Sequence, residues 1–265
     1  MCFKKWFRPP IVPINPVERR LLTFGKNKYG GQNLQGCWND SLNLSKELLL
    51  LYPDFDVRKF RDGEVTVNRY ISEVENAISL LNPGATVLVM ADSCFSGTIT
   101  RFPGMGLIEK NHPTRNRFYD QGLPQRKTVN KKIFRNSGNL RWIVMSGCGE
   151  HQTSADAYIG GQYVGAFTYF AIIALEKGMT YKQWYDRIRE YLPSAYFSQS
   201  PTLEGPDELL NRKVFEDETL VIHNSSHGTY TYDIDGDESD GQDEALYFDK
   251  ILIDDKIGQI LSKIP

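Results

Sequence analysis

The chain has 265 residues, 40% of them hydrophobic and 24% charged, and this length is enough to bury a large core in one α/β domain. A formal net charge of -2 gives no reason to expect nucleic acid or an anionic membrane as a partner, and no apolar run of roughly 18 residues predicts a membrane span. The four cysteines have neither the spacing of a disulfide framework nor that of a zinc site, so we expect a reducing, cytoplasmic location.

The chain begins with a proline-rich stretch, residues 1–17, that predicts a flexible, extended N-terminal arm. We expect the remaining residues, 18–265, to form a single domain. The first part of this domain alternates between strand and helix patterns. We expect strands over residues 19–25, 55–60 and 85–91, and helices over residues 40–52 and 66–81. This β-α-β-α-β order predicts a parallel sheet with crossover helices.

The third of these strands leads into a loop that contains a candidate nucleophile. Its near-continuous apolar run predicts a strand buried on both faces, and Asp92-Ser93-Cys94-Phe95-Ser96-Gly97 follows at its carboxyl end. Functional sites of open α/β sheets lie at that end of the strands. Cys94 is therefore a candidate nucleophile if a histidine reaches it, and the alternative is that Cys94 is one more buried thiol.

The middle of the chain contains a long basic segment. Residues 98–140 are rich in Arg, Lys, Pro, Gly and Asn and have no sustained period, which predicts a long exposed loop. Beyond this loop we expect a buried strand over residues 141–148 and helices over residues 166–177 and 181–191. Residues 194–215 indicate a loop with room for an edge strand.

The last segment, residues 218–265, supplies a candidate base. Its strand pattern runs into Ser225-Ser226-His227-Gly228, and of the four histidines only His227 combines a strand end with a following glycine. Carboxyl ends of neighbouring parallel strands meet at one edge of a sheet, so we expect His227 beside Cys94, where its imidazole would make the thiolate available. The N–H groups of Gly228 and Cys94 are candidates to bind the oxyanion of the reaction.

These residues resemble a known family. Asp92–Gly97 together with Ser225–Gly228 resembles the catalytic pair of the caspase-like peptidases, specifically the metacaspase branch. Four further stretches share the resemblance, residues 36–40, 146–156, 165–168 and 199–205. The resemblance covers residues 18–265 and implies the caspase fold, a mostly parallel central β-sheet flanked by helices. It also implies a cysteine endopeptidase that cleaves after Arg or Lys.

The resemblance implies a pocket for the residue that precedes the cleaved bond. This residue is P1 and its pocket is S1; Asp40 and Asp92 would bind the P1 side chain, with Cys37 and Ser225 lining the pocket. Carboxylates in a partly desolvated pocket favour a guanidinium or an ammonium. Two alternatives stay open, because Asp40 could instead cap the leucine-rich helix and Asp92 could stabilise a turn.

The acidic loop over residues 233–244 raises the question of a metal. The resemblance implies a regulatory calcium ion bound by Asp243, Asp254 and Asp255, and carboxylate oxygens suit calcium. Against this, Arg101 stands where the family has a further acid. Acids also occupy EF-hand-like positions 1, 3, 5 and 12, at Asp233, Asp235, Asp237 and Glu244, but Glu238 replaces the glycine that such a loop needs. A solvated acidic turn is the alternative.

The order of the segments departs from the family. In relatives the histidine segment precedes the cysteine segment, whereas His227 here follows Cys94, so residues 218–265 are predicted to be transposed to the C-terminal end of the chain. The short linker 216–218 makes it hard for this strand to reach a slot beside the first strand. Either the preceding segment crosses the sheet in a monomer, or the strand completes a second molecule in a strand-swapped dimer.

The sequence therefore predicts a cysteine endopeptidase that acts on protein or peptide substrates with Arg or Lys at P1, through Cys94 and His227. Its basic loop, residues 98–140, is a candidate for self-processing, since an enzyme of this specificity would find many cleavable residues there. A plain solvated insertion is the alternative for the loop. For the whole chain, the alternative is a catalytically inactive caspase-like binding or scaffold module.

Overall fold

The computed structural model describes residues 18–93, 113–119, 121, 140–149, 152–232 and 242–265. At its centre lies a six-stranded sheet in the order β2-β1-β9-β3-β5-β8. The strands are β1 (Arg19–Gly25), β2 (Phe55–Arg61), β3 (Thr86–Asp92), β5 (Ile143–Ser146), β8 (Thr202–Glu204) and β9 (Thr219–Ser225). All neighbouring pairs are parallel except β5 with β8. The predicted mostly parallel α/β sheet is confirmed.

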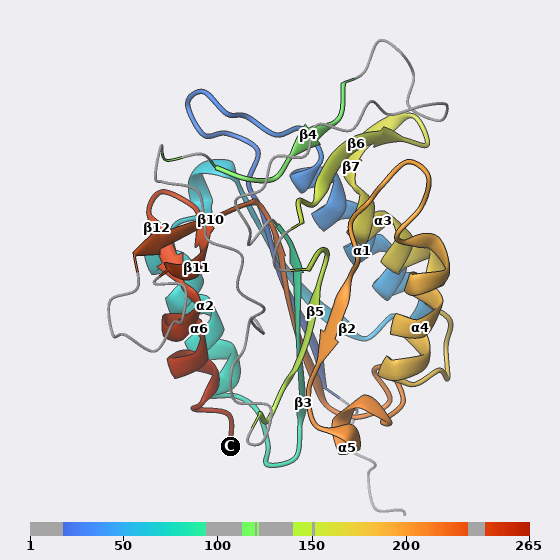
Figure 1. Ribbon diagram of the computed structural model, residues 1–265. Helices are drawn as coiled ribbons and strands as arrows, with labels where there is room; N and C mark the ends of the chain where they lie inside the picture. The colour runs from blue at the N-terminus through green and yellow to red at the C-terminus, as the bar shows by residue number, and fades with distance from the viewer. Residues whose placement is uncertain (1–17, 94–112, 120, 122–139, 150–151, 233–241) are drawn as a thin grey trace, which may run out of the picture.

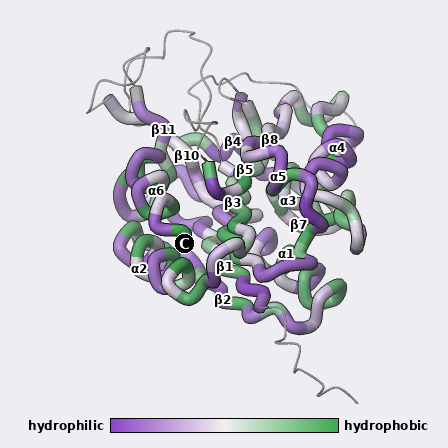
Figure 2. The backbone as a smooth tube through the Cα atoms, turned by 90° about the horizontal axis from the view of Figure 1, so that it is seen from below, coloured by the Kyte–Doolittle hydropathy of each residue, from purple (hydrophilic) through white to green (hydrophobic). Residues whose placement is uncertain are grey.

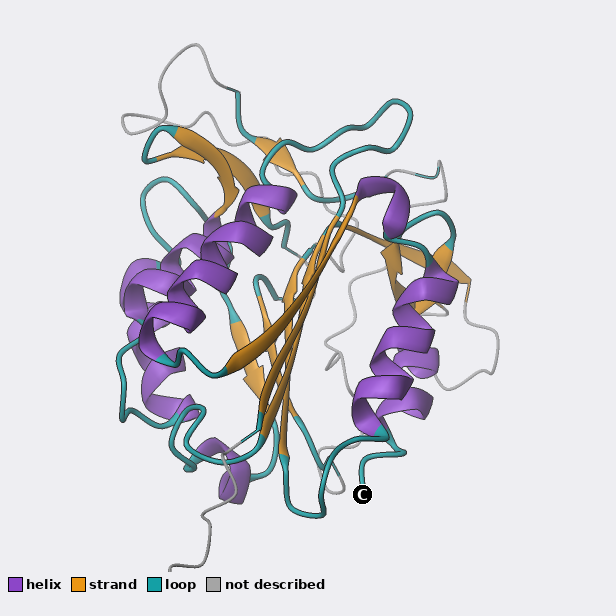
Figure 3. Ribbon diagram, turned by 180° about the vertical axis from the view of Figure 1, so that it is seen from behind, coloured by secondary structure: helices purple, strands orange, loops and turns teal. Residues whose placement is uncertain are grey.

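Helices cover both faces of this sheet (Figures 1 and 3). One face carries α2 (Val67–Ile78) and α6 (Asp254–Leu261), and the other carries α1 (Cys37–Leu51), α3 (Ala166–Ala174) and α4 (Tyr181–Tyr191). Seen from below, the strands run between these two helix layers (Figure 2). The described residues also include two short helical turns, η1 (Asp62–Glu64) and α5 (Asp207–Leu210). Among the described residues, none of the helices combines the length and the apolar character needed to cross a membrane.

Strand β3 shows why the sheet is buried on both sides. All seven of its residues are buried. Val87 and Val89 pack into the core under α2 and α6, whereas Leu88 and Met90 point the other way into the core under α1, α3 and α4. The alternation follows from the two-residue side-chain period of a strand. A continuous apolar run is what a strand between two helix layers requires, as the sequence predicts.

Strand β9 fills the slot between β1 and β3 within one chain. Thr219 pairs with both Arg19 and Thr86, and the register continues to Ser225. The preceding segment reaches this slot because it packs around the end of the sheet, where Val214 and Phe215 are fully buried. A single chain is therefore enough to complete the sheet, although the oligomeric state stays a prediction.

Two small sheets lie at the end of the central sheet where β1, β3 and β9 end (Figure 1). One contains β10 (His227–Tyr232), β11 (Gln242–Tyr247) and β12 (Ile251–Ile253); the other contains β4 (Arg115–Asn116), β6 (Ala155–Ile159) and β7 (Gln162–Gly165). The β6–β7 hairpin turns at Gly160 and Gly161, whose φ angles are +61° and +88°. Two consecutive positive φ angles are typical of a type I′ turn, and glycine adopts them without steric cost.

The strands and helices predicted over the first ninety or so residues are confirmed with small shifts at their ends, and α4 has the predicted bounds. The sequence interpretation missed the β6–β7 hairpin, and it assigned His227 to a loop where the structure has strand β10. The prediction of a long exposed loop over 98–140 is wrong for the described residues 115–119, which include β4 and two buried side chains. The N-terminal arm, residues 1–17, lies outside the described residues.

Candidate active site

A fully buried arginine lies at the end of the central sheet, enclosed by three carboxylates. One terminal nitrogen of Arg117, Nη2, lies 2.6 Å from Oδ2 of Asp40 and 3.2 Å from Oδ1 of Asp156. The other, Nη1, lies 3.4 Å from Oδ1 of Asp92 and donates hydrogen bonds to the Asp92 carbonyl oxygen at 2.9 Å and to Oγ of Ser225 at 2.6 Å. The side chains of Arg117 and all three acids are inaccessible to solvent.

Each carboxylate is held in place by other parts of the chain. Asp40 accepts hydrogen bonds from the Gly165 N–H at 2.8 Å and the Ser225 hydroxyl at 2.7 Å. Asp92 accepts from the Thr168 N–H and hydroxyl at 2.9 and 2.7 Å. Asp156 accepts from the N–H groups of residues 35 and 36, both at 2.8 Å. The three carboxylates are therefore held in fixed positions by backbone donors that lie just before α1, in α3 and at the β7–α3 junction.

Burial dominates the electrostatics of this pocket. Burial raises the pKa of the Asp40 carboxyl. Arg117 acts to lower this pKa and Asp92 acts to raise it, and the resulting value is about 6. For Arg117, burial acts to lower the guanidinium pKa, but the neighbouring acids, Asp92 first, raise it well above its usual value. Burial also raises the pKa of the Cys37 thiol beside them. The pocket is a site for a cation, because buried acids need a positive partner to stay ionised.

The backbone of the arginine segment is held between two strands. The Arg117 N–H donates to the Ser154 carbonyl at 3.0 Å, and the Arg117 carbonyl accepts from the Gly228 N–H at 2.8 Å. On one side of Arg117, β4 pairs antiparallel with β6. On the other side, Phe118 forms a parallel bridge with Gly228. The segment thus lies extended across the pocket, with a backbone donor directed at the carbonyl of the buried residue.

His227 lies beside this segment, at the start of β10. Its Nε2 is 2.6 Å from the carbonyl oxygen of Gln32, an acceptor that fixes the proton on Nε2 and leaves Nδ1 with a lone pair. Nδ1 is buried and has no hydrogen-bond partner within the described part of the chain. Burial lowers the pKa of His227 to about 4, so the imidazole is neutral at physiological pH. An unprotonated Nδ1 next to a held carbonyl is suited to general-base chemistry.

Comparison with known proteins gives two distant relatives. The chain is 27% identical over 163 residues to Metacaspase-1 of Lodderomyces elongisporus, covering 48% of this chain and 35% of that protein. It is 40% identical over 65 residues to Metacaspase-1 of Mycosarcoma maydis, covering 24% of this chain and 16% of that protein. These matches are a likeness to metacaspases over part of the chain. The chain spans only a minor part of the length of either relative.

A solved structure supports the fold. The chain resembles the crystal structure of protein GSU0716 from Geobacter sulfurreducens, with a TM-score of 0.53 and 18% sequence identity. The match covers 75% of this chain and 98% of the other. A scan against models of known protein families found no match. The observed architecture, a mostly parallel central sheet flanked by helices, is compatible with a caspase-like fold.

The structure brings together the four residues expected to form S1. Cys37, Asp40, Asp92 and Ser225 are all buried around the Arg117 guanidinium. The alternative of Asp40 as a helix cap is wrong, because α1 begins after Gly36 and the Asp40 carboxylate binds Arg117 instead. Cys94 lies outside the described residues, as do Arg101 and the acids Asp233, Asp235 and Asp237. The geometry between Cys94 and His227 stays a prediction.

Two residues of this pocket were missed from the sequence, Arg117 and Asp156. Asp156 falls within a stretch that carries the family resemblance, so its position offered a signal. Arg117 is one basic residue among many in residues 98–140, and nothing in its local sequence distinguishes it. Its buried environment is created by acids that are distant in sequence.

The acids proposed for calcium lie near one another but do not converge. Burial raises the pKa of Asp254 to about 8, with Glu244, Asp255 and Asp243 adding to the effect. Within the described ranges, no group of three such side chains is arranged to hold a metal ion. The described residues therefore do not form a metal centre on their own.

Gly165 provides a test of how tightly the pocket encloses its occupant. A Cβ atom at this position would lie 2.7 Å from Cζ of Arg117 and would also collide with the Asp92 carboxylate. We expect Gly165→Ala to lower the free energy of unfolding by about 1–3 kcal/mol through overpacking. Gly31→Ala is the control, since its Cβ would meet nothing within 4 Å. Urea denaturation of both variants measures the difference, and equal midpoints would show that the pocket is looser than described.

Proposed function

We propose that this chain is a cysteine endopeptidase that cleaves peptide bonds after Arg, and less efficiently after Lys. The observation that carries the proposal is the way Arg117 is bound. Its side chain is buried among Asp40, Asp92 and Asp156, and its carbonyl accepts a hydrogen bond from the Gly228 N–H. A P1 residue needs both features, a side-chain pocket and a donor at the carbonyl that becomes the oxyanion.

In this proposal Cys94 is the nucleophile and His227 is the base. Nδ1 of His227 removes the thiol proton, and the Cys94 sulfur forms a bond to the P1 carbonyl carbon. The N–H groups of Gly228 and Cys94 stabilise the resulting oxyanion. The imidazolium returns its proton to the leaving amine as the C–N bond breaks, and water then hydrolyses the thioester with His227 again as base. The Gln32 carbonyl keeps the imidazole in the required tautomer.

The preference for Arg over Lys follows from the contacts of the two terminal nitrogens. Nη1 reaches Asp92 and Ser225, and Nη2 reaches Asp40 and Asp156. Nε has no acceptor among the described residues. A planar fork satisfies both sides of the pocket at once, whereas the single ammonium of Lys is a point charge.

We also propose that the enzyme processes itself, at the bond between Arg117 and Phe118. Arg117 occupies the S1 pocket of its own chain, so the segment that follows it is placed as the leaving group. Until this bond is cut or the segment leaves, substrates in solution must displace it. The substrates are protein or peptide chains, the location is cytoplasmic, and residues 218–265 are a transposed counterpart of the histidine segment of metacaspases.

A reporter peptide with Arg at P1 tests the activity directly. We expect the wild type to release the reporter group and Cys94→Ala to reduce the rate by at least about a thousandfold, because the covalent step is lost. Equal rates from the two proteins would contradict the enzyme proposal and favour the inactive binding module. A regulatory role for calcium is a further proposal, which rests on the family resemblance alone. Activity lost in a chelator and restored by added calcium would support it.

Self-processing is tested by incubating the purified chain and identifying its fragments by mass spectrometry. We expect a new amino terminus at Phe118, and we expect Arg117→Ala to abolish that cut because alanine leaves the three acids without a cation. Arg115→Ala is the matched control and retains the cut, since the Arg115 side chain lies outside the acidic pocket and contacts the Asn33 carbonyl. An intact wild-type chain that nevertheless cleaves the reporter would rule out this internal bond.

The raised pKa of Asp40 predicts how the pocket responds to pH. Because Arg117 lowers the pKa of Asp40 and the residual value is about 6, a bound cation and the ionised carboxylate favour each other. In Arg117→Ala, where the pocket is free, we expect the dissociation constant of benzamidine to fall as pH rises through and above about 6. Asp40→Asn should flatten this dependence. Titration by calorimetry measures it, and tighter binding at lower pH would reverse the assigned sign.

A further inference from the structure

We propose that the cleft beyond the cleaved bond selects aromatic residues, with Tyr230 contacting the first residue after the bond and Tyr247 the second. These positions are P1′ and P2′. The inference rests on the proposed function, since it takes Arg117 as P1. It adds a specificity on the leaving-group side, which neither the acidic pocket nor the family resemblance addresses.

The backbone of residues 117–119 is held along the edge of β10. The Tyr119 N–H donates to the Gly228 carbonyl at 2.9 Å, next to the bond from the Gly228 N–H to the Arg117 carbonyl. The Thr229 hydroxyl donates to the Tyr119 carbonyl at 3.0 Å. The side-chain Nε2 of Gln121 donates to the Tyr230 carbonyl at 2.9 Å. The two bonds between main-chain groups, at Arg117 and Tyr119, would form with any extended peptide, so selectivity must come from side-chain contacts.

The P1′ side chain, Phe118, packs against an aromatic ring, that of Tyr230. The rings of Phe118 and Tyr230 stack with centroids 5.6 Å apart and planes 25° apart. Both residues are buried, with exposed fractions of 9% and 5%, and they form an apolar cluster of their own. Stacked rings gain attraction beyond the area they bury. A small residue at P1′ would leave the face of Tyr230 without this partner.

The P2′ side chain rests on a second aromatic surface. Tyr119 stacks on Tyr247 with a centroid distance of 3.8 Å and an interplanar angle of 17°. The ring of Tyr29 contacts both, with its centroid 6.1 Å from that of Tyr119 and 5.9 Å from that of Tyr247. Its ring is also 4.5 Å from the imidazole of His227. An aromatic P2′ residue therefore completes a ring cluster that borders the candidate base.

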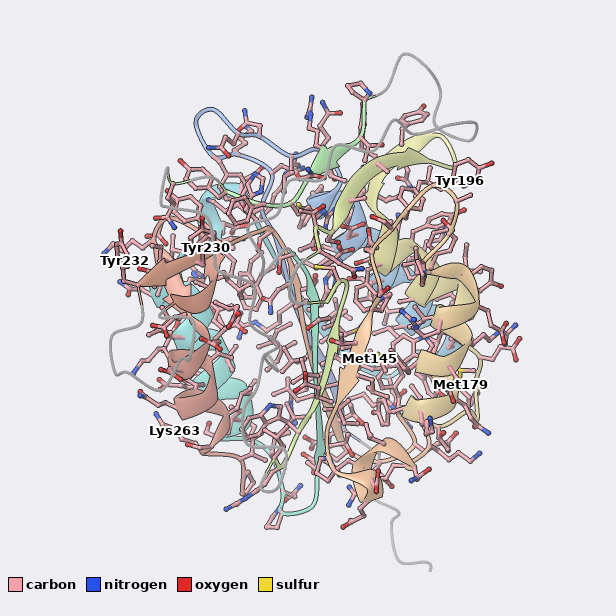
Figure 4. All side chains as sticks on the ribbon, in the orientation of Figure 1. Met145, Met179, Tyr196, Tyr230, Tyr232 and Lys263 are labelled. Carbon is pink, nitrogen blue, oxygen red and sulfur yellow. The ribbon has the colours of Figure 1, made fainter. Side chains whose placement is uncertain are left out.

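The two rings of the cleft come from positions that the fold fixes. Tyr230 belongs to β10, and Tyr247 lies opposite His227 in the β10–β11 pair. Tyr232, two residues further along β10, is 57% exposed. Figure 4 labels Tyr230 and Tyr232 on the same small sheet. Tyr232 therefore offers a control of the same residue type on the same strand.

The test measures peptide binding to a chain that cannot cleave and whose own segment no longer fills the cleft. This chain combines Cys94→Ala with Arg117→Ala, Phe118→Ala and Tyr119→Ala. One peptide has the sequence of residues 114–121, Thr-Arg-Asn-Arg-Phe-Tyr-Asp-Gln, and a second has Ala-Ala in place of Phe-Tyr. We expect the second to bind about 25-fold more weakly by fluorescence anisotropy, about fivefold for each lost ring pair.

Variants of the cleft assign the preference to its rings. Adding Tyr230→Ala should reduce the ratio of the two affinities about fivefold, whereas adding Tyr232→Ala should leave the ratio unchanged. Equal binding of the two peptides would overturn the inference. This failure is distinguishable from failure of the proposed function, because the latter shows as no reporter cleavage by the wild type, whatever the ratio of the affinities.

A second measurement in the otherwise unaltered chain covers the case in which the multiple variant does not fold. Phe118→Ala should slow self-cleavage after Arg117 about fivefold, and Phe118→Tyr should keep the wild-type rate because a ring is retained. If both variants cleave at the wild-type rate, the aromatic contact has no role and the inference is wrong. If both are slowed equally, Phe118 contributes something other than its ring, and the inference is again wrong.

Discussion

The structure depends on balancing the negative charge of three carboxylates that are buried away from water. Asp40, Asp92 and Asp156 are fully buried at the end of the sheet, and a single guanidinium neutralises part of their charge. Removing one partner of a buried ion pair typically costs about 3–5 kcal/mol, because the remaining charge is left without compensation. The pocket is therefore unfavourable when empty, and the fold places several backbone N–H donors around the acids to lower that cost.

The same contacts would make the internal segment both substrate and inhibitor in the proposed enzyme. A segment tethered to the chain has a high effective concentration at the cleft, so a peptide in solution competes at a disadvantage. Arg117 contributes the charge and the residues after it contribute the aromatic contacts. The two parts act on opposite sides of one bond, and cutting that bond separates them. Competition by the chain itself would then weaken, because neither part alone makes all the contacts.

The sequence predicts much of this fold because its signals are local. The apolar run of β3, the leucine pattern of α1 and the choice of Asp40 and Asp92 as candidate S1 residues all follow from neighbouring residues and the family motif. The β6–β7 hairpin also has a local signal, Gly160-Gly161 between strand-forming residues. Arg117 had none. Its burial depends on acids from α1, β3 and β6, and a single sequence does not contain those distances.

Strand β9 has a consequence for the order in which the protein forms during synthesis. It pairs with β1 from the start of the described chain and with β3 from its first half, yet it follows both in sequence. A ribosome therefore produces two sheet edges, on β1 and β3, well before the strand that joins them. Non-local pairing of this kind is slow, and unpaired edges attract other chains. Strand β3 would therefore stay without its β9 neighbour until β9 emerges, so the proposed protease activity would arise only after nearly all of these residues have been made.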